Sequence, residues 1–346
     1  MTASELLGTR YPLIQGGMAS IATAQLASAV SNAGGMGLVG AGGMNSEMLR
    51  DNIRKCREMT DNPFGVNIML MHPLVDEMAE IVIEEGVKFV TTGAGNPAKY
   101  IDRWKAAGIK VVPVVPSTTL AKRMVRAGAD GVIVEGSEAG GHIGELSTMA
   151  LVPQVVDAVD VPVIAAGGIA SGRQVLAAFA LGATAVQVGT CLLVAEECPI
   201  HDNYKHAVIK ANDTATTVTG RINGVPVRII KNRMSANYIK REKEGATMEE
   251  LEHFTLGSLR RAVLEGDVTT GSLMAGQVSG MCNRIRPCAD IISDLFLEAE
   301  QAFQWLKRSD CRQLQPCPTK LIDASACSRN PSGKSLGKCT QASASA

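Results

Sequence analysis

Short apolar runs alternate with longer stretches of helical periodicity between residues 12 and 190. Eight of these runs are too short for helices and rich in β-branched side chains, which is typical of strands buried on both faces of a parallel sheet. Glycine ends most of the helical stretches between them, as expected of helix C-termini. The predicted strands are Pro12–Gln15, Met36–Val39, Phe64–Ile68, Lys88–Thr92, Lys110–Val114, Gly131–Val134, Val161–Ala166 and Ala183–Val188.

Eight strand–helix units in succession predict an α/β fold, a (β/α)8 TIM barrel, over residues 1–198. A doubly wound sheet would normally have fewer strands before its order reverses. The predicted helices are Ala24–Asn32, one opening at Asn45, Pro73–Glu85, Ala98–Ala107, Thr118–Ala127, one beginning at Met149, and Ser171–Leu181.

The pattern changes after the barrel. Residues 199–308 predict an appended, mainly helical subdomain that covers the barrel mouth, with Thr214–Arg228 as irregular loop or short strands. Residues 309–346 are rich in Ser, Pro, Lys and Cys without periodicity, and we expect a disordered tail there. The predicted subdomain helices are His201–Ala211, Thr247–Leu264 and Ile291–Leu306.

Composition narrows the class of protein. The chain is 46% hydrophobic but only 3% aromatic, and its formal net charge is +0, which argues against nucleic-acid binding. Apolar segments are broken by Gly, Pro or charge, so no membrane span is predicted, and the N-terminus lacks a signal-peptide pattern. We therefore expect a cytoplasmic protein. The cysteines form no CxxC pair and the histidines no HExxH motif, so no metal site is predicted.

The candidate chemistry centres on the loop that follows the sixth predicted strand, from Glu135 to Gly144. In barrels, such strand-to-helix loops carry the active site. Gly140 and Gly141 lack side chains, so backbone can approach a ligand closely, and His142 is a titratable group presented from the same loop. The alternative is a tight turn with a solvated histidine.

Two further loops, Gly167-Gly168 and Gly189-Thr190, follow the seventh and eighth strands, where phosphate sites recur in this fold. A phosphorylated planar cofactor fits this pattern, and FMN fits best. Side chains at strand ends could bind its ring or ribityl chain, although each could equally be a structural polar residue. The strand-end candidates for cofactor binding are Asn67, Thr92, Glu135, Gln187 and Val188.

Across roughly residues 5–305, the phrases IQGGMA, FGVNIML, TTGAGNP, EGSEAGGHIG, PVIAAGGIA, AVQVGT and SLMAGQVSG resemble the FMN-dependent enoyl-acyl-carrier-protein reductase II family. That family is related to the nitronate monooxygenases, and both share the EAGGH motif. The resemblance implies an FMN phosphate at Gly168, Gly189 and Thr190, and His142 beside the thioester carbonyl. It also implies a flavin lined by Gly17, Met18, Asn67, Glu135, Gly140 and Gln187.

The resemblance further implies an NAD(P)H-dependent reduction of trans-2-enoyl thioesters carried by acyl carrier protein or CoA, in a homodimer that could respond to a monovalent cation. A nitronate monooxygenase, using the same FMN and His142, is the alternative enzyme, and a non-catalytic flavin sensor is a third reading. One departure concerns Cys191, which stands where the family usually has arginine; Arg228 is a candidate to supply the missing charge.

Overall fold

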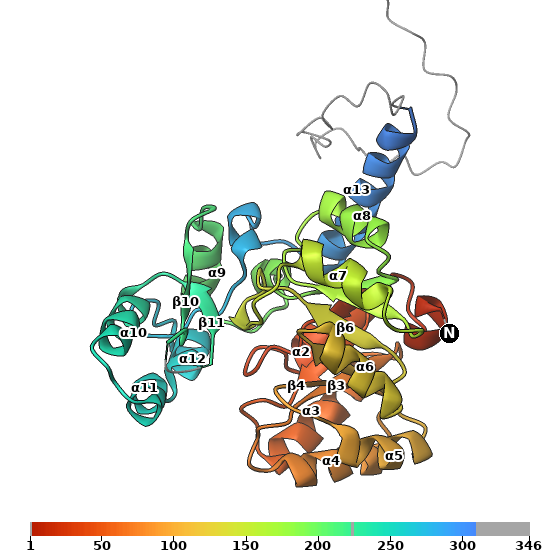
Figure 1. Ribbon diagram of the computed structural model, residues 1–346, viewed down its shortest axis with the longest axis horizontal. Coiled ribbons are helices and arrows are strands. Elements are labelled where there is room, and N and C mark those ends of the chain that lie inside the picture. Colours follow the sequence, from red (N-terminus) through yellow and green to blue (C-terminus); the bar gives the residue numbers. More distant parts are fainter. Residues whose placement is uncertain (1, 223–224, 309–346) are drawn as a thin grey trace, which may run out of the picture.

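The computed structural model describes residues 2–222 and 225–308, and eight of their strands form a barrel (Figure 1). The parallel strands are hydrogen-bonded in the order β1-β9-β8-β6-β5-β4-β3-β2, and a bridge between Ile14 and Met36 joins the two ends. The predicted (β/α)8 barrel is confirmed. The strands are β1 (Leu13–Gln15), β2 (Gly37–Gly40), β3 (Phe64–Met69), β4 (Phe89–Gly93), β5 (Lys110–Val115), β6 (Val132–Glu135), β8 (Val163–Ala166) and β9 (Ala185–Val188).

Helices follow the strands around the outside of the barrel (Figure 1). Two of them begin at an N-cap side chain: Asn45 Oδ1 accepts from Met48 N at 2.8 Å, and Ser117 Oγ accepts from Leu120 N at 3.3 Å. These helices are α2 (Ala24–Asn32), α3 (Ser46–Met59), α4 (Val75–Glu84), α5 (Ala98–Ala106), α6 (Thr118–Arg126), α7 (Thr148–Val156) and α8 (Gly172–Ala180).

Side chains that point into the barrel fill its lower part, so the interior is packed rather than hollow. Each of seven strands contributes to this buried cluster, and Leu6 and Leu7 of the short helix α1 (Ala3–Leu7) close it from below. Space for a ligand therefore remains at the carboxyl ends of the strands. The strand residues of the cluster are Ile14, Leu38, Phe89, Val112, Ile133, Ile164, Ala166 and Ala185.

The subdomain is built around a small antiparallel sheet, which lies beside the barrel with its helices (Figure 1). Strands β10 (Thr216–Thr219) and β11 (Val227–Ile230) form a hairpin, and β11 pairs on its other side with β7 (Gly141–His142) from the barrel. The remaining elements are η1 (Thr190–Val194), α9 (Asp202–Ile209), α10 (Arg233–Lys243), α11 (Met248–Thr255), α12 (Ser258–Arg260), η2 (Arg261–Glu265) and η3 (Gln277–Met281).

Three details differ from the sequence-based expectation. Helix α10 was not predicted, and the single helix expected over Thr247–Leu264 is broken at Gly257, which adopts φ +71°. The last helix, α13 (Cys288–Arg308), was expected in the subdomain but packs against the outer barrel helices α8 and α2. The tail predicted for residues 309–346 lies outside the described residues.

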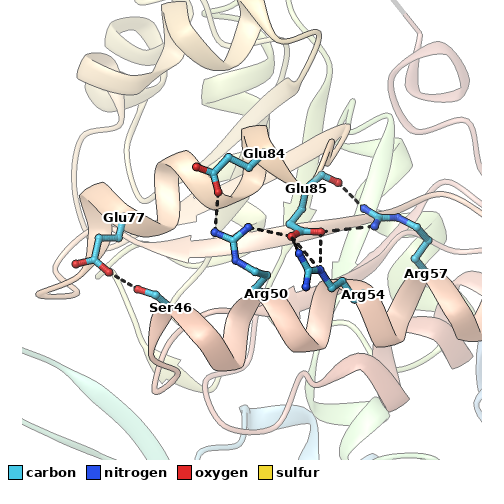
Figure 2. Close-up of polar contacts among 7 residues, drawn as sticks. All are labelled: Ser46, Arg50, Arg54, Arg57, Glu77, Glu84 and Glu85. Carbon is cyan, nitrogen blue, oxygen red and sulfur yellow. Dashed lines mark hydrogen bonds and ion pairs between the residues drawn. The ribbon is translucent and has the colours of Figure 1, made fainter.

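An ionic cluster ties α3 to the end of α4 (Figure 2). Glu85, whose side chain is 7% exposed, accepts from Arg50 at 2.9 Å and from Arg54 at 2.8 Å, and Arg57 lies 3.6 Å away. The hydrogen bond from Arg54 is the main cause that lowers the pKa of Glu85.

In the parts of the chain that the structure describes, no helix is long and apolar enough to cross a membrane.

Candidate active site

The carboxyl ends of the barrel strands surround a cavity of about 510 Å³, a size suited to a cofactor. Every predicted site residue except Thr92 lines it. The subdomain adds Val225, Met274 and Val278 to the wall. The predicted residues that line the cavity are Gly17, Met18, Asn67, Glu135, Gly140, Gly141, His142, Gly167, Gly168, Gln187, Val188, Gly189 and Thr190.

Asn67 is held at one side of this cavity by two contacts. Its Oδ1 accepts from Thr91 Oγ1 at 2.9 Å, and its Nδ2 donates weakly to the Gly17 carbonyl at 3.4 Å. Gly17 must be glycine, because a Cβ atom there would lie 2.1 Å from Asn67 Cγ. Strand alternation turns the neighbouring Thr92 to the other face of β4, where its buried hydroxyl has no partner among the described residues. Thr92, which the sequence assigned to the site, therefore lies away from the cavity, and Thr91 is the threonine that supports Asn67.

The two glycine turns lie beside each other at the ends of β8 and β9. Gly167 and Gly168 have φ values of +88° and +74°, which favour glycine, and Gly189 precedes the 3₁₀ helix η1. The N–H groups of Gly168 and Gly189 have no hydrogen-bond acceptor among the described residues. Free backbone donors at adjacent turns are what an anionic group such as a phosphate requires.

Glu135 ends β6 and its half-buried side chain faces the cavity. No hydrogen bond or ion pair joins its carboxyl to another described residue. Burial raises its pKa to about 8, so the carboxyl is mainly protonated at neutral pH. A protonated carboxyl can donate a hydrogen bond to a ligand while adding no negative charge to the cavity.

His142 lies on the two-residue strand β7, opposite Val227 of β11. Its side chain is open to the cavity, but the surrounding protein atoms displace water and lower its pKa. The imidazole is therefore neutral near pH 7 and can donate from one ring nitrogen. Ile143 N donates to the Pro226 carbonyl at 3.1 Å, which extends the pairing past His142.

The loop between β6 and β7 is held mainly through Glu138, which the sequence analysis did not select. The Glu138 carboxylate accepts from Thr148 N and Oγ1 at 3.0 Å, which caps the start of α7, and the Glu138 carbonyl accepts from Gln277 N at 2.9 Å. Gly276 N donates to Thr190 Oγ1 at 2.9 Å. An acidic residue ten positions before a helix carries no local capping signal, so only the structure reveals this role.

Neither residue named for the missing family arginine brings a positive charge to the cavity. Cys191 is 4% exposed within the hydrophobic core, and burial raises the pKa of its thiol well above the usual range. Arg228 does not line the cavity.

Within residues 2–222 and 225–308, no group of three His, Cys, Asp or Glu side chains has the arrangement of a metal site.

Comparisons with known proteins identify the family of this chain. The family model for nitronate monooxygenase matches residues 1–298. FabK from Thermotoga maritima, a solved structure, has a TM-score of 0.87 and 46% identity, covering 89% of this chain and 98% of its own. A probable nitronate monooxygenase of Staphylococcus saprophyticus is 34% identical over 79% of this chain and 90% of its own. A methyl-oxo-octahydroindene-carboxyl-CoA dehydrogenase of Rhodococcus jostii is 31% identical over 86% and 94%, respectively. The chain is therefore an oxidoreductase that belongs to the nitronate monooxygenase family.

Proposed function

We propose that the protein is an FMN-dependent, NAD(P)H-using reductase of trans-2-enoyl thioesters carried by acyl carrier protein or CoA. The observation that carries the proposal is the likeness to FabK, an enoyl-acyl-carrier-protein reductase II, at 46% identity over 98% of that chain. The Rhodococcus relative is also named for a CoA thioester, which makes thioester chemistry a recurring theme among the similar proteins.

The residues at the cavity fit FMN. Unpaired N–H groups at Gly168 and Gly189 suit its phosphate, and the Asn67, Glu135 and Gln187 side chains can hydrogen-bond its ring or ribityl hydroxyls. Gly140 lets the subdomain backbone pack closely beside this space, because a Cβ there would lie 2.7 Å from Ala275 Cα. When bound, FMN supplies hydride transfer between a nicotinamide and the β-carbon of the enoyl thioester.

The chain's own contribution is to place charges and donors around that reaction. Neutral His142 donates a hydrogen bond to the thioester oxygen, where negative charge develops, and so lowers the barrier. Protonated Glu135 avoids a second negative charge in the same cavity. Val225, Met274 and Val278 give the cavity an apolar wall toward the subdomain, which excludes water and suits an acyl chain.

An anaerobic visible spectrum of the purified protein tests this proposal. We expect a flavin spectrum that bleaches when NADH or NADPH is added and returns when crotonyl-CoA follows. A protein without flavin, or a reduced flavin that crotonyl-CoA does not reoxidise, would contradict it.

The second candidate is a nitronate monooxygenase, favoured by the family match and by the name of the staphylococcal relative. In that case, His142 would act on the alkyl nitronate, and oxygen would be consumed with nitronate in the absence of NADH. Oxygen-electrode traces with a nitronate, set against NADH oxidation with crotonyl-CoA, separate the two activities. The homodimer, the response to a monovalent cation and the cytoplasmic location stay predictions.

A further inference from the structure

The strand that carries His142, β7, is only two residues long and lies at the edge of the three-stranded sheet. Its backbone neighbours are Val227 and Arg228 of β11, which pair with His142 and Gly141. A strand this short has few hydrogen bonds of its own, so its position depends on what holds the loop before it.

Arg228 holds that loop. Its Nη2 and Nε donate to the Ser137 carbonyl at 2.9 and 3.1 Å, and its Nη1 donates to Thr216 Oγ1 at 3.1 Å. One guanidinium thus joins the first part of the β6–β7 loop to both strands of the β10–β11 hairpin. The fork geometry of arginine makes all three bonds possible at once.

The burial of Arg228 is unusual for a structural contact. The residue is 6% exposed and forms no ion pair among the described residues, although the charge of Glu138 attracts it from beyond ion-pair distance. Burial lowers the pKa of its guanidinium. A buried cation that binds a carbonyl instead of an anion is costly, and an apolar residue would serve packing alone better.

We propose that Arg228 is a positioning residue for His142: by binding the Ser137 carbonyl and Thr216, it fixes the β6–β7 loop and so holds the imidazole over the cavity. This inference rests on the proposed catalytic role of His142. It also gives the subdomain a task beyond covering the mouth, because the hairpin is the support from which the histidine is presented.

A double-mutant cycle tests the proposal, with Arg228→Met made in the wild type and in His142→Ala. Enzyme reduced anaerobically with NADH is mixed with crotonyl-CoA, and flavin reoxidation is followed by stopped flow. In the wild type, Arg228→Met should slow reoxidation on the order of tenfold to a hundredfold, the range for a misplaced catalytic group. FMN content and the rate of flavin reduction by NADH should be unchanged.

In the His142→Ala background, Arg228→Met should cause no further slowing, because there is no imidazole left to position. Effects that multiply instead, or loss of bound FMN, would overturn the proposal in favour of a structural role. Arg228→Lys should be slowed less than Arg228→Met, since an ammonium keeps one bond to Ser137. Arg233→Met, an exposed arginine at the start of α10, is the matched control and should match the wild type.

If Arg228→Met does not fold, Thr216→Val provides the test, because it removes only one of the three hydrogen bonds that Arg228 donates. We expect a slowing of about two- to fivefold that disappears in the His142→Ala background; slowing that persists there would overturn the proposal. Failure of the proposed function has a different signature, since wild-type flavin would then not be reoxidised by crotonyl-CoA. The same cycle would then be measured on nitronate oxidation.

Discussion

Glu85, beneath the barrel, and Glu135, in its mouth, are carboxyl groups in opposite circumstances. Glu85 is surrounded by Arg50, Arg54 and Arg57, and the hydrogen bonds from Arg54 and Arg50 lower its pKa (Figure 2). Glu135 has no partner among the described residues, and burial raises its pKa to about 8. The same side chain is thus ionised at one end of the barrel and mainly protonated at the other.

This difference follows the division of labour in barrel enzymes, where the amino-terminal face supports stability and the carboxyl-terminal face carries chemistry. A carboxyl that only stabilises the fold is best fully paired. A carboxyl left unpaired in a cavity reduces stability unless a ligand uses it, so its position there indicates function. Four substitutions test whether the two ends are separable in this way.

The largest effect is expected from Gly168→Val in the mouth. A Cβ at residue 168 would lie 3.3 Å from Glu138 Cβ, and φ +74° disfavours valine. The strained turn would no longer offer its N–H to a phosphate, so the purified variant should contain no FMN by absorbance. A yellow, fully loaded variant would show that the phosphate lies elsewhere.

His142→Ala should retain FMN and slow the reduction of enoyl thioester on the order of a hundredfold, the usual effect of losing one positioned donor. Steady-state rates with crotonyl-CoA, together with the flavin absorbance of the variant, measure both parts. Full activity would remove His142 from the proposed mechanism.

Glu135→Gln should change the pH dependence rather than the rate at pH 7. The folded protein keeps a proton on Glu135 between its ordinary pKa of 4.5 and about 8, so the wild-type free energy of unfolding falls as pH rises through this window. Denaturant unfolding of the apoprotein at pH 5 and pH 9 should show that glutamine removes part of this fall. Equal pH dependence in both proteins would contradict a protonated Glu135.

Glu85→Gln should have the smallest effect, confined to stability. The loss is about 1–2 kcal/mol in the free energy of unfolding at pH 7, because the arginines are half exposed and water replaces part of the hydrogen bonding. The lowered pKa makes this contribution present above pH 4.5 and lost as pH falls further. Flavin content and activity should be unchanged; a loss of activity would show that the two ends are coupled.

Much of the barrel was predictable from the sequence, because each strand and each glycine-capped helix is a local pattern. Helix Ala24–Asn32 has the bounds expected from its sequence, and the strand-end glycines Gly168 and Gly189 line the cavity as predicted. Such residues are identified by their place at the end of a strand, which neighbouring residues alone define.

The support around the site was not predictable, because it depends on contacts between distant segments. Strand β7 exists only through its partner β11, which lies more than eighty residues later. Thr91 and Thr92 look equivalent in sequence, and only the register with Asn67 decides which one hydrogen-bonds it. Arg228 was considered as a source of charge for an anion, yet its contact is the Ser137 carbonyl.

The shared strand β7 limits how this protein can be recombined with its relatives. A chimera that exchanged the subdomain alone would replace β11 and Arg228 while keeping the loop they hold. The β6–β7 loop with β7 and the strands β10 and β11 should therefore be exchanged together, because substitutions in one must be compatible with the other. Directed evolution of acyl preference should vary these two segments together, and crossover points are better placed in the outer helices of the barrel.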